Sequence, residues 1–163
     1  MRRFFMMSAL VWFGVVTAGA QTKISGTLQC GKADQANVLP VGDSPDHSLG
    51  VEQGKCTWTK PLEIEGAKSK EGIGTATDDI SSNTVSSRGF NVTTMDSGDK
   101  FFVRYQGTTT LKDGAPIRSK GEWGFTGGTG KLKGIKGKGT YTCAPPSGDV
   151  TTCEIEGEYQ LAK

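Results

Sequence analysis

Histidine, closely spaced cysteines and long apolar runs are scarce in this sequence, and each scarcity argues against a class of function. The single histidine, His47, lies in the turn-like segment 43–47 with no nucleophile motif beside it, so no catalytic triad is predicted. Structural zinc sites use C-x₂₋₄-C pairs, and the four cysteines include none. We therefore expect neither a metal ion nor a cofactor. Beyond position 20, no apolar run approaches the length of about 20 residues that a membrane-spanning helix needs.

Phosphate-binding motifs and an excess of charge are also missing. No G-x-x-x-x-G-K-[ST] motif is present, and the glycine-rich segment 127–130 is expected to join two strands rather than to open a helix. The 19 lysines and arginines exceed the 17 acidic residues by only two, and Arg2 and Arg3 account for that excess. The rest of the chain, without Arg2 and Arg3, has no net charge. It is therefore a poor match for a polyanion, and no nucleic-acid partner is expected.

The first twenty residues have the layout of a secretory signal peptide. Arg2 and Arg3 precede an apolar run over 4–16, and Ala18, Gly19 and Ala20 supply a small-residue cleavage site. We expect residues 1–20 to be removed, which leaves one domain over 21–163. The mature protein is then secreted or periplasmic.

All four cysteines lie in the predicted mature chain, and an even number in an exported protein indicates disulfides. Zinc is the rival interpretation, and the wide spacing disfavours it. We expect Cys143 to pair with Cys153 at matching ends of a hairpin. We expect Cys30 to pair with Cys56, because this bridge would tie the 31–47 loop to the second strand.

The mature chain reads as all-β, because no helical periodicity is sustained and turn signals recur about every ten residues. The segment 31–47 is the longest irregular stretch, and we expect it to be a mobile loop. Eight antiparallel strands can close an up-and-down barrel around a filled or ligand-holding interior. The predicted strands are 23–30, 49–58, 71–80, 84–95, 99–111, 117–126, 135–143 and 153–161.

Strand register follows from the requirement that apolar residues share one face, since a slip of one residue would turn them outward. A two-residue turn at Ser97 and Gly98, and a five-residue loop through Asp113 and Gly114, both satisfy this requirement. The cross-strand pairs they predict are Phe90–Tyr105, Val92–Val103, Tyr105–Trp123, Val103–Phe125 and Leu111–Ile117.

A three-residue turn over 81–83 sets Ala76 opposite Arg88, so the Arg88 side chain is predicted to point inward. Gly107 and Gly121 then present a wall without side chains to the guanidinium, and Asp78 lies diagonally within reach. One interpretation is a structural ion pair, or a register error that leaves Arg88 on the solvated face. The other is a small anion-accepting pocket beneath an aromatic row of Phe90, Tyr105 and Trp123.

The last hairpin contains a lysine cluster, which has two interpretations. Lys131, Lys133, Lys136 and Lys138 suggest a polyanion site, but three glutamates face them on the neighbouring strand. A solvated barrel exterior with cross-strand charge pairs is the simpler interpretation. The pairs predicted with the Cys143–Cys153 bridge are Tyr141–Ile155, Gly139–Gly157, Gly137–Tyr159 and Lys138–Glu158.

The segment 124–137, G-F-T-G-G-T-G-K-L-K-G-I-K-G, resembles the T-G-G-T/S-G-x-F/L-x-G-x-x-G turn of allene oxide cyclase-like and dirigent-like barrels. The resemblance implies an eight-stranded antiparallel barrel that acts on, or steers, small apolar molecules in its lumen. It extends over about fourteen residues. The four cysteines are not part of the family pattern, and no catalytic position of the family can be transferred to this chain.

Three functions remain, from different classes. The first is a non-catalytic barrel that binds a small apolar or amphipathic anion in its lumen, with a ligand site made by Arg88, Phe90, Tyr105, Trp123, Asp78, Gly107 and Gly121. The second is an isomerase or cyclase in which Arg88 and Asp78 act on the substrate. The third is a structural or interaction protein of the cell envelope. The oligomeric state does not follow from the sequence.

Overall fold

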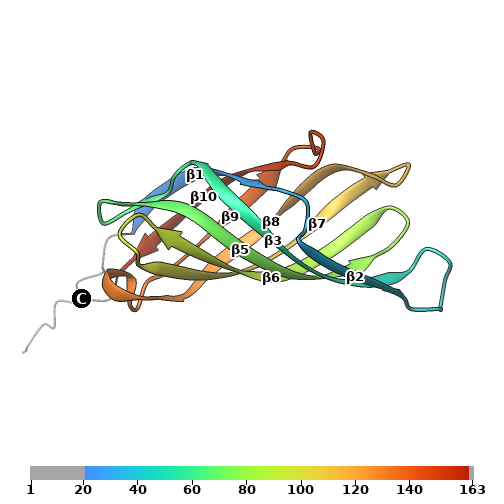
Figure 1. The fold of residues 1–163 in the computed structure, drawn as a ribbon, viewed down its shortest axis with the longest axis horizontal. Coiled ribbons are helices and arrows are strands. Elements are labelled where there is room, and N and C mark those ends of the chain that lie inside the picture. Colours follow the sequence, from blue (N-terminus) through green and yellow to red (C-terminus); the bar gives the residue numbers. More distant parts are fainter. Residues whose placement is uncertain (1–20, 162–163) are drawn as a thin grey trace, which may run out of the picture.

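The computed structural model describes residues 21–161, which form one antiparallel sheet that closes on itself as a barrel (Figure 1). Eight strands make the barrel, in the order β1-β10-β9-β8-β7-β6-β5-β3, and pairing of β3 with β1 closes the circle. Their bounds are β1 (Thr22–Cys30), β3 (Ser48–Lys60), β5 (Ala67–Ile80), β6 (Thr84–Met95), β7 (Lys100–Lys112), β8 (Ala115–Gly128), β9 (Lys136–Cys143) and β10 (Thr151–Gln160).

The predicted eight-stranded antiparallel barrel is therefore confirmed, and each predicted strand overlaps one strand of the structure. Two short strands, β2 (Gln35–Pro40) and β4 (Glu63–Ile64), and a 3₁₀ turn, η1 (Gly130–Leu132), complete the described elements. No helix in the described part of the chain is long and apolar enough to cross a bilayer. The predicted signal peptide, 1–20, lies outside the described residues.

The mobile loop predicted over 31–47 is wrong for its central part, which forms β2. Because β1 pairs only with the 56–60 end of β3, the edge of β3 that faces away from β5 is free at the other end, and β2 pairs with this edge from Gln35–Gln53 to Pro40–Ser48. Val41 N donates to His47 O. In an antiparallel strand, successive N–H groups point alternately toward the partner strand and away from it, so the nitrogen of the preceding residue, Pro40, points away from β3. A proline is tolerated at such an edge position, since its missing N–H is not needed.

The hydrophobic core fills one end of the barrel. Phe125 packs edge-to-face against Phe101 and Trp123, with ring centroids 5.4 and 5.1 Å apart. Gly139 and Gly157 make room for the Trp123 indole, because a Cβ on Gly157 would lie 2.5 Å from its Cζ2 atom. The buried core residues are Ile24, Trp58, Leu62, Ile64, Met95, Phe101, Trp123, Leu132, Ile135 and Tyr159.

Two hairpins adopt the predicted register. In β7–β8, Tyr105 is opposite Trp123 and Val103 is opposite Phe125, as predicted. A register shift after Thr110 places Leu111 opposite Pro116, so its predicted pairing with Ile117 is wrong. All the predicted pairs of β9–β10 are confirmed, from Cys143–Cys153 to Gly137–Tyr159.

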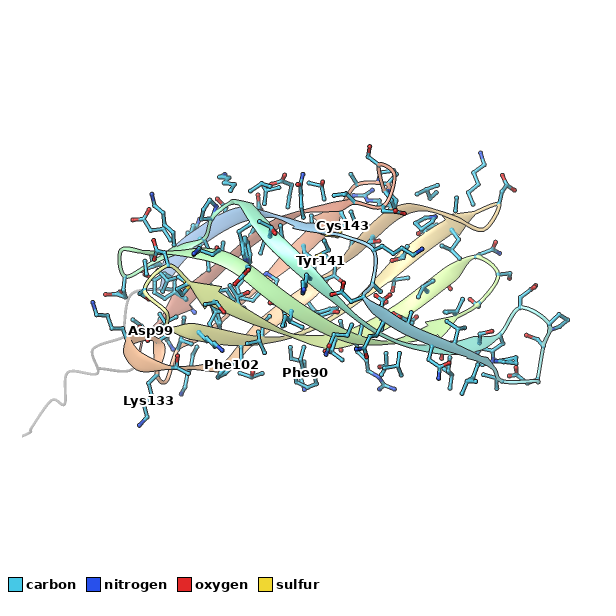
Figure 2. All side chains as sticks on the ribbon, viewed as in Figure 1. Phe90, Asp99, Phe102, Lys133, Tyr141 and Cys143 are labelled. Carbon is cyan, nitrogen blue, oxygen red and sulfur yellow. A yellow bond between two sulfur atoms is a disulfide. The ribbon has the colours of Figure 1, made fainter. Side chains whose placement is uncertain are left out.

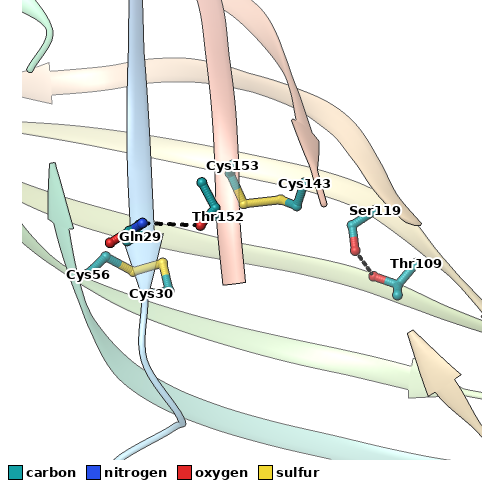
Figure 3. Close-up of a disulfide and its surroundings, with 8 residues drawn as sticks. All are labelled: Gln29, Cys30, Cys56, Thr109, Ser119, Cys143, Thr152 and Cys153. Carbon is teal, nitrogen blue, oxygen red and sulfur yellow. Dashed lines mark hydrogen bonds between the residues drawn. A yellow bond between two sulfur atoms is a disulfide. The ribbon is translucent and has the colours of Figure 1, made fainter. Parts of the chain in front are cut away.

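Both predicted disulfides are present (Figure 3). Cys30–Cys56 joins the end of β1 to β3, and Cys143–Cys153 joins the end of β9 to β10. Close to the second bridge, Thr109 and Ser119 share a hydrogen bond of 2.7 Å between β7 and β8. The two bridges therefore tie neighbouring strands of the barrel wall together.

Candidate ligand site

The structure separates the predicted site residues onto two faces of the barrel wall. Arg88 is opposite Thr77 and Gln106 rather than Ala76, and Phe90 is opposite Thr75 and Arg104 rather than Tyr105. Both side chains consequently lie on the outer face. Phe90 is 58% exposed, and Figure 2 shows it pointing away from the barrel. The predicted inward position of Arg88 is wrong, and the interpretation with Arg88 on the solvated face is the correct one.

Loop lengths explain this one-residue shift in both hairpins. Ser81 N donates to Thr84 O, so the β5–β6 turn has two central residues instead of three. Met95 N donates to Asp99 O, so the β6–β7 turn has three central residues instead of two. Gly98 has φ +87°, the left-handed conformation that a three-residue hairpin loop places before the returning strand. Together the two changes shift β6 by one residue against both neighbours.

Five of the predicted site residues face the interior: Asp78, Tyr105, Trp123, Gly107 and Gly121. Trp123 belongs to the core, where it is 7% exposed and donates from Nε1 to Thr140 O at 3.2 Å. The glycine wall exists, but the ring of Tyr141 covers it. An added Cβ on Gly121 would lie 2.6 Å from Tyr141 Cε1, and one on Gly107 would overlap the Tyr141 hydroxyl.

An open cavity of about 1050 Å³ occupies the end of the lumen away from the core. Asp78, Ser87 and Tyr141 face it from β5, β6 and β9, and Gly50 and Gly107 leave room between them. Its wall is built from six strands, β3 and β5 to β9, so the site depends on the curvature of the sheet rather than on one loop. Arg88 and Lys120 also border the cavity, but from outward-facing strand positions.

Two carboxylates give the lumen a negative character. Asp78 Oδ1 accepts a hydrogen bond of 2.5 Å from Ser87 Oγ. Glu52 is opposite Ala76 and Asp78 is opposite Gly50, so the two acids are diagonal neighbours on one face. Glu52 lies two residues nearer the core end than Gly50 and outside the cavity lining, and its side chain keeps access to solvent. Partial burial raises the pKa of the Glu52 carboxyl, and the negative charge of Asp78 raises it further.

Two phenols line the lumen beside these acids. The rings of Tyr105 and Tyr141 meet edge-to-face with centroids 6.2 Å apart. Burial raises the pKa of both phenols, and nearby negative charge, including that of Asp78, adds to the shift. Both hydroxyls therefore remain protonated at neutral pH. They supply aromatic surface and hydrogen-bond donors next to the carboxylates.

Sequence reasoning missed three groups of this site: Glu52, Ser87 and Tyr141. The inward position of Tyr141 could have been predicted, because its predicted partner Ile155 faces inward on β10 and directly opposite residues share one face of the sheet. Ser87 was hidden by the register error. The sole histidine, His47, bonds to Asp43 and Asp79 on the outside of the wall and does not contribute to the cavity.

The architecture is that of a small closed β-barrel with a packed end and an open, acidic end. No protein-family model matches the chain, and no curated protein matches it by sequence.

Two solved structures share the fold. A conserved protein of unknown function from Rhodopseudomonas palustris is 11% identical with a TM-score of 0.55, over 85% of this chain and 98% of that one. A protein of unknown function from the DUF3224 family of Shewanella oneidensis is 16% identical with a TM-score of 0.50, over 88% of this chain and 99% of that one. At such identities the likeness extends to the fold alone.

Proposed function

We propose that this barrel binds, without transforming it, a small amphipathic molecule that carries a cationic head such as a protonated amine. The observation that supports this function is the pair Asp78 and Glu52 on the lumen face, with no lysine or arginine facing the lumen among residues 21–161. The sequence-based expectation of an anionic ligand depended on an inward Arg88, and the register removes that cation from the lumen.

The size and lining of the cavity fit such a ligand. A volume of about 1050 Å³ exceeds what a drug-sized molecule needs, and it is open to solvent on one side. The ring of Tyr141 lines the cavity and can hold an apolar body, and a cation near an aromatic face gains a further attraction. The Asp78 carboxylate, held in place by Ser87, would accept hydrogen bonds from an ammonium group.

The test is a calorimetric titration of the chain 21–163 with dodecylamine and, separately, with dodecanoate. We expect dodecylamine to bind and dodecanoate to bind at least tenfold more weakly. Asp78→Asn should weaken amine binding at least tenfold, because it removes a charge that the ligand contacts in a partly desolvated cavity. Glu156→Gln is the matched control, because Glu156 is an exposed residue of β10 that does not border the cavity, and it should bind like the wild type.

Stronger binding of dodecanoate, together with its loss in Arg88→Ala, would contradict this proposal and restore the anionic ligand. Equal affinity of Asp78→Asn and Glu156→Gln would also contradict it.

The alternative function is an isomerase or cyclase of the allene oxide cyclase-like or dirigent-like kind, acting in the same lumen. The observation in its favour is the raised pKa of Glu52 beside Asp78 and two phenols, since acid–base catalysis uses such neighbouring groups. Product formation from a bound substrate, abolished by Glu52→Gln, would favour catalysis over simple binding.

Both proposed functions are those of an exported protein, and two features of the chain indicate export. Two disulfides are typical of proteins from an oxidising compartment. We infer that residues 1–20 direct export and are cleaved after Ala20, and that 21–163 acts as one domain in the periplasm or outside the cell. Protein recovered from the extracytoplasmic fraction should begin at Gln21 by N-terminal sequencing. Protein retained in the cytoplasm with an intact Met1 would contradict this inference.

A further inference from the structure

An apolar patch of four residues lies on the outer wall of the barrel, over β5, β6 and β7. Ile73 is directly opposite Val92, Val92 is directly opposite Phe102, and Phe90 lies two residues from Val92 on the same face of β6. Ile73, Phe90 and Val92 are 48%, 58% and 38% exposed, and Phe102 is half-buried. Figure 2 shows Phe90 and Phe102 on the same side of the barrel.

The other side of the barrel has a different surface. Within the part of the chain that the structure describes, β1, β9 and β10 carry no exposed large hydrophobic residue. Their outer faces carry charged pairs such as Lys138 opposite Glu158. Exposed hydrophobic residues also lie on β2 and β3, at Val38, Leu39, Leu49 and Val51, so the apolar exterior covers the side of the barrel made by β2, β3, β5, β6 and β7 and is absent from β1, β9 and β10.

Cations surround the apolar patch. Its charged neighbours, directly across a strand pair or two residues along a strand, are Lys55, Arg88, Lys100, Arg104 and one acid, Glu71. No carboxylate oxygen of residues 21–161 lies within 4.0 Å of any of these four cations. The patch is thus apolar at its centre and positive at its rim.

We propose that the apolar patch docks the barrel onto the surface of an anionic lipid bilayer. Exposed phenylalanines insert at the boundary between headgroups and acyl chains, and neighbouring lysines and arginines are attracted to anionic lipids. A second copy of the chain fits poorly, because two copies facing each other would bring their cationic rims together. Docking through this wall leaves β9 and β10, on the other side, facing solvent.

The docking is independent of the lumen. Asp78 and Glu52 face the interior, whereas all four patch residues face outward, so the side chains that carry the two proposals differ, and only the rim cation Arg88 also borders the cavity. Failure of amine binding therefore leaves this inference intact, and failure of docking leaves the proposed function intact.

The experiment measures co-sedimentation of the chain 21–163 with vesicles. One set contains phosphatidylglycerol and phosphatidylcholine in equal parts, and the other contains phosphatidylcholine alone. We expect at least tenfold tighter binding to the anionic vesicles. Phe90→Ser combined with Val92→Thr should weaken that binding at least tenfold by removing the inserted side chains. Arg88→Glu combined with Arg104→Glu should abolish the preference for phosphatidylglycerol.

Ile117→Ser is the matched control, because Ile117 is 44% exposed but lies at the start of β8, outside the patch. It should bind anionic vesicles like the wild type, as should Asp78→Asn. Thermal melts check that each variant is folded. Equal binding by the Phe90→Ser, Val92→Thr variant, or no binding by the wild type, would overturn the docking. So would a wild-type dimer in light scattering that this variant converts to a monomer without affecting vesicle binding.

Discussion

Removal of both disulfides is expected to lower the free energy of unfolding by about 6 kcal/mol, because each bridge contributes about 3 kcal/mol in the chain-entropy model. The bridged cysteines are 26 and 10 residues apart, and the two closed loops do not overlap. The two effects should therefore add. A typical domain has only about 5–15 kcal/mol of stability, so the doubly reduced barrel should be close to unfolding.

Urea denaturation measures this effect in three variants. Cys30→Ala with Cys56→Ala removes one bridge, Cys143→Ala with Cys153→Ala removes the other, and the third variant combines all four substitutions. Each pair should shift the midpoint with little change in slope. A loss below about 1 kcal/mol for either pair would mean that the unfolded chain is not restricted by that bridge. Ellman's reagent should detect no free thiol in the native wild-type protein.

The same cysteines explain why the last hairpin was predictable from sequence. A bridge between Cys143 and Cys153 requires the two residues to be opposite each other, and this one condition fixes every other pair of β9–β10. The β7–β8 register was predictable for a different reason. There, Tyr105, Val103 and their partners are large apolar residues that have to share the core face.

β6 has neither a bridged cysteine nor large apolar residues on its inward face to indicate its register, and its apolar pattern favoured the wrong face. The inward residues of β6 near the middle of the barrel are Gly89, Asn91 and Thr93, which are small or polar. Gly89 is inward because the Tyr105 ring lies against it, and an added Cβ would be 2.7 Å from Tyr105 Cζ. Thr93 Oγ1 donates to Asn91 Oδ1 at 2.8 Å, which offsets the burial of both polar groups. Contacts of this kind are not visible in the sequence of one strand.

The predicted and observed sites therefore share a lumen but differ in the sign of its charge. A shift of one residue exchanged an inward Arg88 for Ser87, while Asp78 kept its inward position. Without the guanidinium, nothing on the lumen face neutralises Asp78 and Glu52 within the described chain. The charge of a binding site in a barrel is consequently more sensitive to hairpin loop length than the fold is.

Trp123→Ala and Phe90→Ala should differ strongly in stability, although both remove one large aromatic side chain. Trp123 is 7% exposed and packs against Phe125, so its truncation should cost about 3–5 kcal/mol. It also leaves Thr140 O without the Trp123 Nε1 donor. Phe90 is 58% exposed on the outer wall, so its truncation should change stability by about 0.5 kcal/mol or less.

Urea melts of the two variants distinguish the two registers of β6. In the register with Phe90 opposite Tyr105, Phe90 would be a core residue, and Phe90→Ala would cost nearly as much as Trp123→Ala. In the observed register, Phe90 is opposite Thr75 and Arg104, and only the tryptophan variant should be strongly destabilised. Losses of similar size in both variants would place Arg88 back in the lumen, which would remove the basis for a cationic ligand.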